Sequence, residues 1–432
     1  MLFNVLFGLF QCCFNNGIIP THWLKSIIKP IPKSSKNDPK LPLSYRGISL
    51  LNCACKLYSS LLNVRLVDHL ERIGLLVDEQ NGFRRGRACI DHIYVLTSIV
   101  RTNIKDGGSI FAGFIDFRKA FDWINRDLLL YKLIKSGING KFYNAIKSLY
   151  SAPIACVSVN DYATGWFPQN DGVKQGDVLS PTLFAIYIND LALEIKASGV
   201  GVKVGDETVC ILLYADDIVL LAQSEEDLQI MLNIVSDWCC KWKLEVNEEK
   251  TQIVHFRKKS IERSNAIFCL GSIELTYTAQ YKYLGLMLDE HGLFDGAVKL
   301  LAQSAGRALG SVINKVKHCG NLGIATFKKL YEAGVCPVAD YGAGVWGFRD
   351  RVACNNVHYR AIRYFLGVHR FAATLAISGD LGWEPPLIRH RCQMARLWNR
   401  FLKMPAHRIT KRTFLWDIAH NCPWANEMKT IL

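Results

Sequence analysis

The chain has 432 residues, half of them apolar, which excludes both a disordered chain and a single ordinary core. Its 52 Lys and Arg exceed its 38 Asp and Glu and give a net charge of +14, which favours a polyanionic partner such as nucleic acid or an anionic membrane. The 15 cysteines form no C-x-x-C pair, and no secretory signal is evident, so we expect reduced thiols in an intracellular protein.

The first ten residues are apolar but lack the positive start and the small-residue cleavage site of a signal peptide. We interpret them as a packing helix. No apolar run in the chain reaches the roughly 20 residues that span a bilayer, so we expect no membrane partner.

A strand with interspersed lysines is expected over residues 23–33, then a Pro- and Lys-rich loop and a helix over 56–73. Residues 81–87, Asn-Gly-Phe-Arg-Arg-Gly-Arg, form a basic turn with two glycines. Glycine lets the backbone approach a ligand, and guanidinium groups bind phosphate through paired donors. The alternative is a solvated basic loop.

Residues 110–122 begin as an apolar strand and continue toward a helix, with Asp116 where the strand ends. Asp116 is either a metal-binding carboxylate or a helix cap. Asn125 and Asp127 then open an amphipathic helix. A Gln-Gly turn at 175–176 precedes another helix, for which Ser180 is the expected N-cap.

Two buried strands flank Tyr214-Ala-Asp-Asp217 within residues 211–222, which indicates an apolar hairpin with carboxylates at its tip. Adjacent carboxylates repel each other and lose hydration there. The turn is either simply solvated or a site for hard divalent cations, which take oxygen ligands. A cation site needs a third carboxylate, and Asp116 is the candidate.

After a helix that begins at Ser224, further strands are expected up to residue 290, and helices over 294–318 and 325–336. Residues 351–432 hold 13 Lys and Arg against 4 Asp and Glu, a balance of +9, together with four tryptophans. That combination fits either a nucleic-acid surface or a basic surface over an aromatic core. The His and Cys residues there lack a regular zinc spacing.

The alternating strands and helices predict an α+β fold. The order of the motifs resembles the reverse transcriptases of non-LTR (LINE-type) retrotransposons, with group II intron enzymes more distant. The matching stretches cover residues 20–290 or so and include Tyr45-Arg-Gly-Ile-Ser-Leu-Leu, Gly82-Phe-Arg-Arg-Gly-Arg, Phe114-Ile-Asp-Phe-Arg-Lys-Ala-Phe-Asp122, Gly172-Val-Lys-Gln-Gly-Asp, Tyr214-Ala-Asp-Asp217, Asn247-Glu-Glu-Lys-Thr251 and Tyr283-Leu-Gly285.

This resemblance implies a right-hand polymerase. The N-terminal segment and fingers would occupy residues 1–110, a palm with an antiparallel sheet 111–290, a helical thumb 291–350 and a basic helical extension 351–432. The activity would be RNA-directed DNA synthesis from dNTPs, with an RNA template and a DNA primer or target DNA as partners. The life cycle of such elements implies both cytoplasm and nucleus.

The resemblance also implies catalytic roles. Asp116, Asp216 and Asp217 would hold two Mg²⁺ ions, for which Mn²⁺ can substitute, and Lys250 would be a general acid for the leaving pyrophosphate. Phe121 would lie beneath the sugar and exclude a ribose 2′-hydroxyl; its alternative is a plain core phenylalanine.

Other positions would bind the nucleotide. Arg84, together with Arg46, Arg85 or Arg87, would contact the triphosphate, and Gln175 and Gly176 would line the pocket. Gly47 stands where the family usually has proline, which would loosen the fingers loop.

No endonuclease domain is recognisable, so target nicking is not assigned to this chain. We interpret the sequence either as a polymerase core from a longer element protein or as a stand-alone gene product derived from one. Two alternatives stay open: a non-catalytic RNA-binding relic, and an RNA-templated RNA polymerase with a similar palm.

Overall fold

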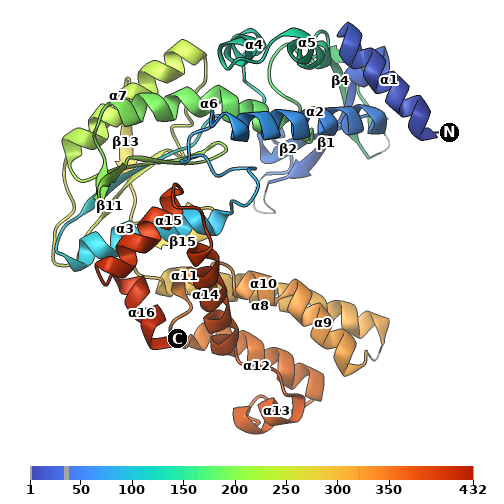
Figure 1. Ribbon diagram of the computed structural model, residues 1–432. Coiled ribbons are helices and arrows are strands. Elements are labelled where there is room, and N and C mark those ends of the chain that lie inside the picture. The colour runs from blue at the N-terminus through green and yellow to red at the C-terminus, as the bar shows by residue number, and fades with distance from the viewer. Residues whose placement is uncertain (1, 34–37, 161, 321, 432) are drawn as a thin grey trace.

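A six-stranded sheet forms the centre of the chain in the computed structural model, which describes residues 2–33, 38–160, 162–320 and 322–431 (Figure 1). The strand order is β12-β13-β11-β3-β10-β9. Their bounds are β3 Ile110–Ile115, β9 Ile211–Tyr214, β10 Asp217–Ala222, β11 Gln252–Phe256, β12 Phe268–Leu270 and β13 Ile273–Tyr277. Strand β3 pairs antiparallel with β10 and β11 as expected, but β13 joins β11 in parallel.

The central strand is apolar throughout because both faces of the sheet are covered. All six residues of β3 are buried. Successive side chains point to opposite faces, so Phe111 and Ile115 enter one hydrophobic cluster while Ala112 and Phe114 enter another. Helices α6 (Ser180–Ala197) and α7 (Glu225–Trp242) cover the first face, and α3 (Cys89–Lys105) covers the second.

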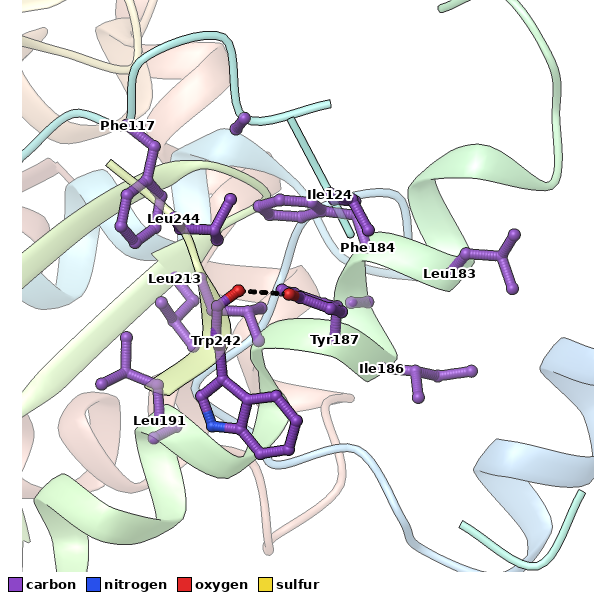
Figure 2. Packing of buried hydrophobic residues seen from close by; sticks show 14 of the residues in the cluster. Phe117, Ile124, Leu183, Phe184, Ile186, Tyr187, Leu191, Leu213, Trp242 and Leu244 are labelled. Atoms are coloured by element: carbon purple, nitrogen blue, oxygen red, sulfur yellow. Dashed lines mark hydrogen bonds between the residues drawn. The ribbon is translucent and has the colours of Figure 1, made fainter. Parts of the chain in front are cut away.

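Aromatic and aliphatic side chains pack together in the first cluster (Figure 2). Phe184 and Tyr187 project from α6, and the Tyr187 hydroxyl donates to the carbonyl oxygen of Trp242 at the end of α7. Ser224 caps α7 through its hydroxyl, as expected. Ser180, however, is not the N-cap of α6: that helix already includes it, and its hydroxyl donates to the Lys174 carbonyl.

A second sheet carries the N-terminal part, with strand order β2-β1-β4-β5 and β6 beside β4. Gly47 lies in strand β2, opposite Pro30, so the expectation that it loosens a loop is wrong. The bounds in this region are α1 Leu2–Asn16, η1 Thr21–Leu24, β1 Lys25–Pro32, η2 Pro42–Ser44, β2 Tyr45–Leu50, α2 Cys53–Arg72, β4 Ile154–Val159, β5 Tyr162–Ala163 and β6 Phe167–Pro168.

Smaller elements connect these sheets. Asn125 caps α4 through its side-chain oxygen, which accepts from the Leu128 amide. The bounds are α4 Arg126–Lys135, α5 Gly140–Leu149, β7 Val202–Val204, β8 Glu207–Val209, β14 Gln280–Tyr283 and β15 Leu286–Asp289.

From residue 295 onward the described chain is helical and forms the lower part of the molecule (Figure 1). The bounds are α8 Asp295–Cys319, α9 Ile324–Gly334, α10 Cys336–Ala339, α11 Ala343–Trp346, α12 Val352–Leu366, α13 Thr374–Leu381, α14 Pro386–Leu402, α15 Ile409–Ala419 and α16 Pro423–Ile431. Helices α8, α9, α10, α12 and α13 share one hydrophobic cluster, which therefore crosses the boundary expected at residue 350.

The last three helices belong to a different cluster. Side chains of α14, α15 and α16 pack with α3 and the second face of the central sheet. Phe401, Phe414 and Trp424 are thus core residues, and Trp398 and Trp416 pack against them. Among the described residues, no helix combines the length and apolar character needed to cross a bilayer.

Candidate active site

Three carboxylates lie where two neighbouring strands end. Asp116 follows β3, and Asp217 opens β10 after the two-residue turn of Ala215 and Asp216. Ile115 pairs with Ile218, so continuing that register by one residue makes Asp116 and Asp217 neighbours. Asp116 therefore lies beside the acidic hairpin, where the sequence placed the third carboxylate.

The three groups repel one another. Burial, then Asp216 and Asp116, raise the pKa of Asp217 to about 6. Burial and Asp116 also raise the pKa of Asp216, while Arg46 and Lys250 oppose both shifts. Within the described ranges, however, no three His, Cys, Asp or Glu side chains are arranged to hold one metal ion as they stand. A bound cation would reduce the electrostatic repulsion among the three carboxylates.

Asp116 is held by the segment that follows α7. Its carboxylate accepts from the side-chain amide of Asn247 at 3.1 Å and lies 3.4 Å from the Lys250 ammonium. Its backbone amide donates to the Thr251 hydroxyl, and its carbonyl accepts from the Asn247 amide. The carboxylate thus faces polar groups of this segment, while the next helix, α4, is capped by Asn125 instead.

A short segment before α3 supports the acidic turn, which the sequence did not predict. Ala215 has a left-handed φ of +55°. The side-chain oxygen of Gln80 accepts from the amides of both Ala215 and Gly82, at 3.0 and 2.8 Å. Around it, Leu213 exchanges backbone hydrogen bonds with Glu79 and Asn81. The segment therefore extends the sheet edge beside β9.

Gly82 is a glycine because of this contact. A Cβ at that position would lie 2.4 Å from the Ala215 nitrogen. The close backbone approach predicted for the basic turn is real, but the neighbour is the acidic hairpin rather than a ligand.

The arginines of that turn are engaged inside the protein. Arg84 makes two hydrogen bonds to the Glu71 carboxylate, at 2.7 and 2.8 Å, and a third to the Val77 carbonyl. Arg87 pairs with Asp78 at 2.8 Å. Both side chains are buried, so in this conformation neither is available for a triphosphate. Arg85 remains exposed.

Other cations face the carboxylates. Arg46, on β2, and Lys250 act on both Asp216 and Asp217. Lys33 is a further cation near the three carboxylates. Burial and the nearby charges of Lys250, Arg46 and Lys119 lower its pKa, which shows that these cations lie close together. The sequence named Arg46 and Lys250 as site residues but not Lys33 and Lys119, although Lys119 lies within the recognised stretch of residues 114–122 and Lys33 ends the strand expected over 23–33.

The residues expected at the nucleotide meet near β2. Phe121 is half-buried and stacks on Phe184 with ring centres 5.0 Å apart. Its carbonyl accepts from Val173, two residues before Gln175, whose own carbonyl accepts from Ser49 on β2. Gly176 has φ of +112°, and a Cβ there would lie 2.9 Å from the Ser49 oxygen. These backbone contacts bring Phe121, Gln175 and Gly176 close together beside β2.

Tyr281 is a further neighbour that the sequence did not single out. Its ring stacks on Phe114 of β3 with centres 4.1 Å apart. Burial, Asp116 and Asp217 all raise the pKa of its hydroxyl, which locates this side chain beside the carboxylates. The sequence feature that could have identified Tyr281 is its place in the same strand as Tyr283, which begins the recognised Tyr283-Leu-Gly285 motif.

The sequence model of the reverse transcriptase (RNA-dependent DNA polymerase) family matches residues 31–288. The chain belongs to this family. The match contains all three carboxylates and Lys250, and together with the mixed sheets and helices it confirms the expected α+β fold class.

Relatives of this reverse transcriptase confirm the resemblance to non-LTR elements. The probable RNA-directed DNA polymerase from transposon BS of Drosophila melanogaster is 27% identical over 402 residues, which cover 90% of this chain and 44% of the relative. The RNA-directed DNA polymerase from mobile element jockey of the same species is 25% identical over 382 residues, covering 86% and 41%. The chain thus spans less than half the length of these curated relatives.

A solved structure of apo telomerase from Candida tropicalis is also similar to this reverse transcriptase. It has 12% sequence identity and a TM-score of 0.46, over 100% of this chain and 70% of that one.

Proposed function

We propose that this chain is the RNA-directed DNA polymerase of a non-LTR retrotransposon, extending a primer 3′-hydroxyl with dNTPs on an RNA template. The observation that carries the proposal is the group of Asp116, Asp216 and Asp217 at adjacent strand ends, surrounded by cations, in a chain of the reverse transcriptase family. DNA primer or target DNA would be the second nucleic-acid partner.

The donor set suits divalent metal. The raised pKa values of Asp216 and Asp217 mean that their charged forms lack compensation, and hard cations with oxygen ligands would supply it. Asp116, Asp216 and Asp217 would hold two Mg²⁺ ions, or Mn²⁺, which when bound would activate the primer hydroxyl and stabilise the leaving pyrophosphate.

The protein's own side chains would position the nucleotide. Arg46, with Lys33 and Lys119 beside it, would bind the triphosphate. Arg84 would instead hold the loop that supports the acidic turn. Lys250 would orient Asp116 through their 3.4 Å contact and donate a proton to the leaving group.

Phe121 would restrict the nucleotide sugar to deoxyribose by occupying the space of a 2′-hydroxyl. Its ring is fixed by stacking on Phe184, and Gln175 and Gly176 would form the wall next to it. Phe121→Val should raise the relative efficiency of NTP incorporation by roughly 10-fold or more, because the smaller side chain leaves room for a 2′-hydroxyl. Single-nucleotide incorporation with matched dNTP and NTP measures this ratio, and Phe121→Tyr is the control that keeps the ring.

We propose that the fingers are built on the second sheet and the palm on the six-stranded sheet. The boundary expected at residue 110 then shifts, because β4, β5 and β6 join the second sheet while α3 packs on the six-stranded sheet. We extend the thumb past residue 350 to about 383, because α12 and α13 share its hydrophobic cluster. Cytoplasm and nucleus would be the compartments in which such an element acts.

Primer extension on an RNA template tests the function. The wild type should extend with dNTPs when Mg²⁺ is present, and Asp216→Ala should lose this activity while still unfolding cooperatively, at a melting temperature in EDTA no lower than that of the wild type. Asp206→Ala, which removes an Asp outside the carboxylate group, is the matched control. Folded wild type without any extension would favour a non-catalytic relic, and extension with NTPs alone would indicate an RNA polymerase.

A further inference from the structure

A basic hollow lies between helix α14 and the loop of residues 84–87. Its volume is about 660 Å³, and five of its lining residues are cationic: Arg85, Arg396, Arg400, Lys403 and Arg408. None of the lining residues within the described part of the chain is acidic. None of them belongs to the carboxylate group or to the nucleotide pocket.

Two of the five cations are fixed by ion pairs with acidic side chains of the chain itself. Arg400 contacts the fully buried Asp91 at 2.8 Å, and Arg408 contacts Asp78 at 3.1 Å. These pairs attach α14 to the first turn of α3 and the start of α15 to the segment before α3, so the guanidinium groups are held at the hollow by the fold itself.

The other three cations lack a strong ion pair among the described residues. Arg396 and Lys403 are exposed, and within the described ranges neither has an acidic partner. Among the residues that the structure describes, Arg85 pairs with Asp68 alone, at 3.4 Å, and both side chains are more than half exposed. An ion pair of this kind contributes little. The hollow therefore holds an excess of positive charge that the chain does not neutralise.

The spacing of these cations suits a repeating anion. Arg396 and Arg400 are four residues apart on one face of α14, and Lys403, three residues further on, is the C-cap of this helix with helical backbone angles. The three cations therefore span about 10 Å of helix axis. A strand of duplex nucleic acid carries about three phosphates over such a length.

A second hollow continues the first along α14. Its volume is about 320 Å³; it shares Arg396 and Arg400, and Gly342 and Gly344 line it. A Cβ on Gly344 would lie 3.0 Å from Leu397 of α14, so glycine permits this close packing. The two hollows together form a trough, and a trough is a poor fit to a flat bilayer surface.

We propose that this trough binds the sugar–phosphate backbone of a nucleic-acid strand through Arg85, Arg396 and Lys403, with Arg400 fixing its floor. The inference rests on the proposed polymerase function and names a contact of its template or primer outside the catalytic group. The Arg400 guanidinium also lies 3.4 Å from the Gly86 carbonyl. Gly82, earlier in the same loop, supports the acidic turn, so a strand in the trough would be positioned relative to the carboxylates.

Binding measured without catalysis tests the proposal. Labelled single-stranded RNA, single-stranded DNA and duplex are titrated with the full chain in EDTA, without nucleotides, over a range of salt concentrations. Arg396→Ala/Lys403→Ala should weaken binding at least several-fold and reduce the salt slope for a single strand by about 1.4, since each phosphate contact contributes about 0.7. The strand whose affinity falls most identifies the occupant.

Two controls isolate the trough from general charge. Lys135→Ala/Lys147→Ala removes two exposed lysines on α4 and α5, which lie at the top of the view and away from α14 (Figure 1), and should leave the slope unchanged. Arg396→Lys/Lys403→Arg keeps both charges and should retain most of the affinity. In primer extension, the alanine pair should raise KM for the template–primer and leave kcat unchanged at saturation.

Equal salt slopes for the alanine pair and the α4/α5 control would overturn the proposal. So would a polyglutamate peptide that binds the wild type as tightly as the strands and loses the same affinity in the alanine pair, since the occupant would then be an acidic protein segment. Because binding needs neither metal nor dNTPs, an inactive polymerase would still report on the trough.

Discussion

At the scale of single residues, charge crowding distinguishes the acidic turn from an ordinary surface turn. Asp217 is partly open to solvent, yet the surrounding protein, Asp216 and Asp116 raise its pKa to about 6. A carboxylate of an unfolded chain titrates near pH 4. Between these values the folded protein binds the extra proton, so this group makes the protein less stable as pH rises from about 4 to 6.

Asp217→Asn should therefore raise the melting temperature in EDTA at pH 7.5, because it removes a charge that the fold compensates poorly. The gain should shrink toward pH 4.5, where Asp217 is already largely protonated. Calorimetry of both proteins at the two pH values measures it, with Asp206→Asn as the control. A gain that is equal at both pH values would contradict the argument.

Bound metal should favour the wild type over Asp217→Asn in stability, the opposite of the order expected in EDTA. Mg²⁺ at about ten times its dissociation constant would stabilise the wild type by about 1.4 kcal/mol through mass action, and Asp217→Asn by less. The same melting experiment with increasing Mg²⁺ measures this, and identical shifts for the two proteins would mean that Asp217 takes no part in binding.

Arg84 illustrates a residue whose type was informative but whose partner was not. A fork of donors suits phosphate and carboxylate equally well. In the fold, Glu71 of α2 and the carbonyls of Val77 and Gln80 occupy those donors. The side chain therefore stabilises the loop under the acidic turn.

At the scale of elements, the acidic hairpin depends on residues more than 130 positions earlier in the chain. Residues 79–82 run beside β9, and the Gln80 side chain accepts hydrogen bonds from both Gly82 and Ala215. Ala215 adopts a left-handed conformation that costs a non-glycine residue about 1–2 kcal/mol. The contact with Gln80 and Gly82 helps to maintain that conformation.

Gly82→Ala should destabilise the protein by about 2–3 kcal/mol and reduce primer extension strongly, because the new methyl group would displace the Ala215 backbone. Gly306→Ala is the matched control: it lies within α8 with open space around it and should stabilise by about 0.5–1 kcal/mol. Urea unfolding and primer extension measure both effects. Unchanged activity in Gly82→Ala would show that the turn tolerates the shift.

At the scale of the whole molecule, the C-terminal helices complete the core around α3. The Tyr94 and Ser98 hydroxyls of α3 donate to the buried carboxylate of Asp417 on α15, at 2.6 and 2.7 Å. Arg400 and Arg408 add their contacts with Asp91 and Asp78. The region that the sequence set apart as a basic extension is thus joined to the second face of the central sheet.

Asp417→Ala should increase hydrogen exchange in both α3 and α15, because it leaves the Tyr94 and Ser98 hydroxyls buried without their acceptor, at a cost of about 1–3 kcal/mol each. Asp380→Ala removes an exposed carboxylate from α13 and should leave both helices unchanged. Faster exchange in α15 with no change in α3 would mean that the C-terminal helices form a separate unit.

The sequence by itself determined the family, the α+β class and the identity of the acidic positions. Those features are local: an apolar strand followed by Asp116, and an apolar hairpin tipped by Asp216 and Asp217, are visible in short windows of residues. The apolar character of β3 was visible for the same reason, and the fold shows that all six of its residues are buried.

Only the tertiary structure decided which charges meet. Whether Arg84 would find Glu71 or a phosphate, and whether the tryptophans after residue 350 would form core or surface, depends on contacts between segments far apart in the chain. Residue type limits such partners without selecting one, because a guanidinium or an indole is satisfied by several environments. Packing then selects the partner, which is why the support of the acidic turn and the trough along α14 emerged only from the fold.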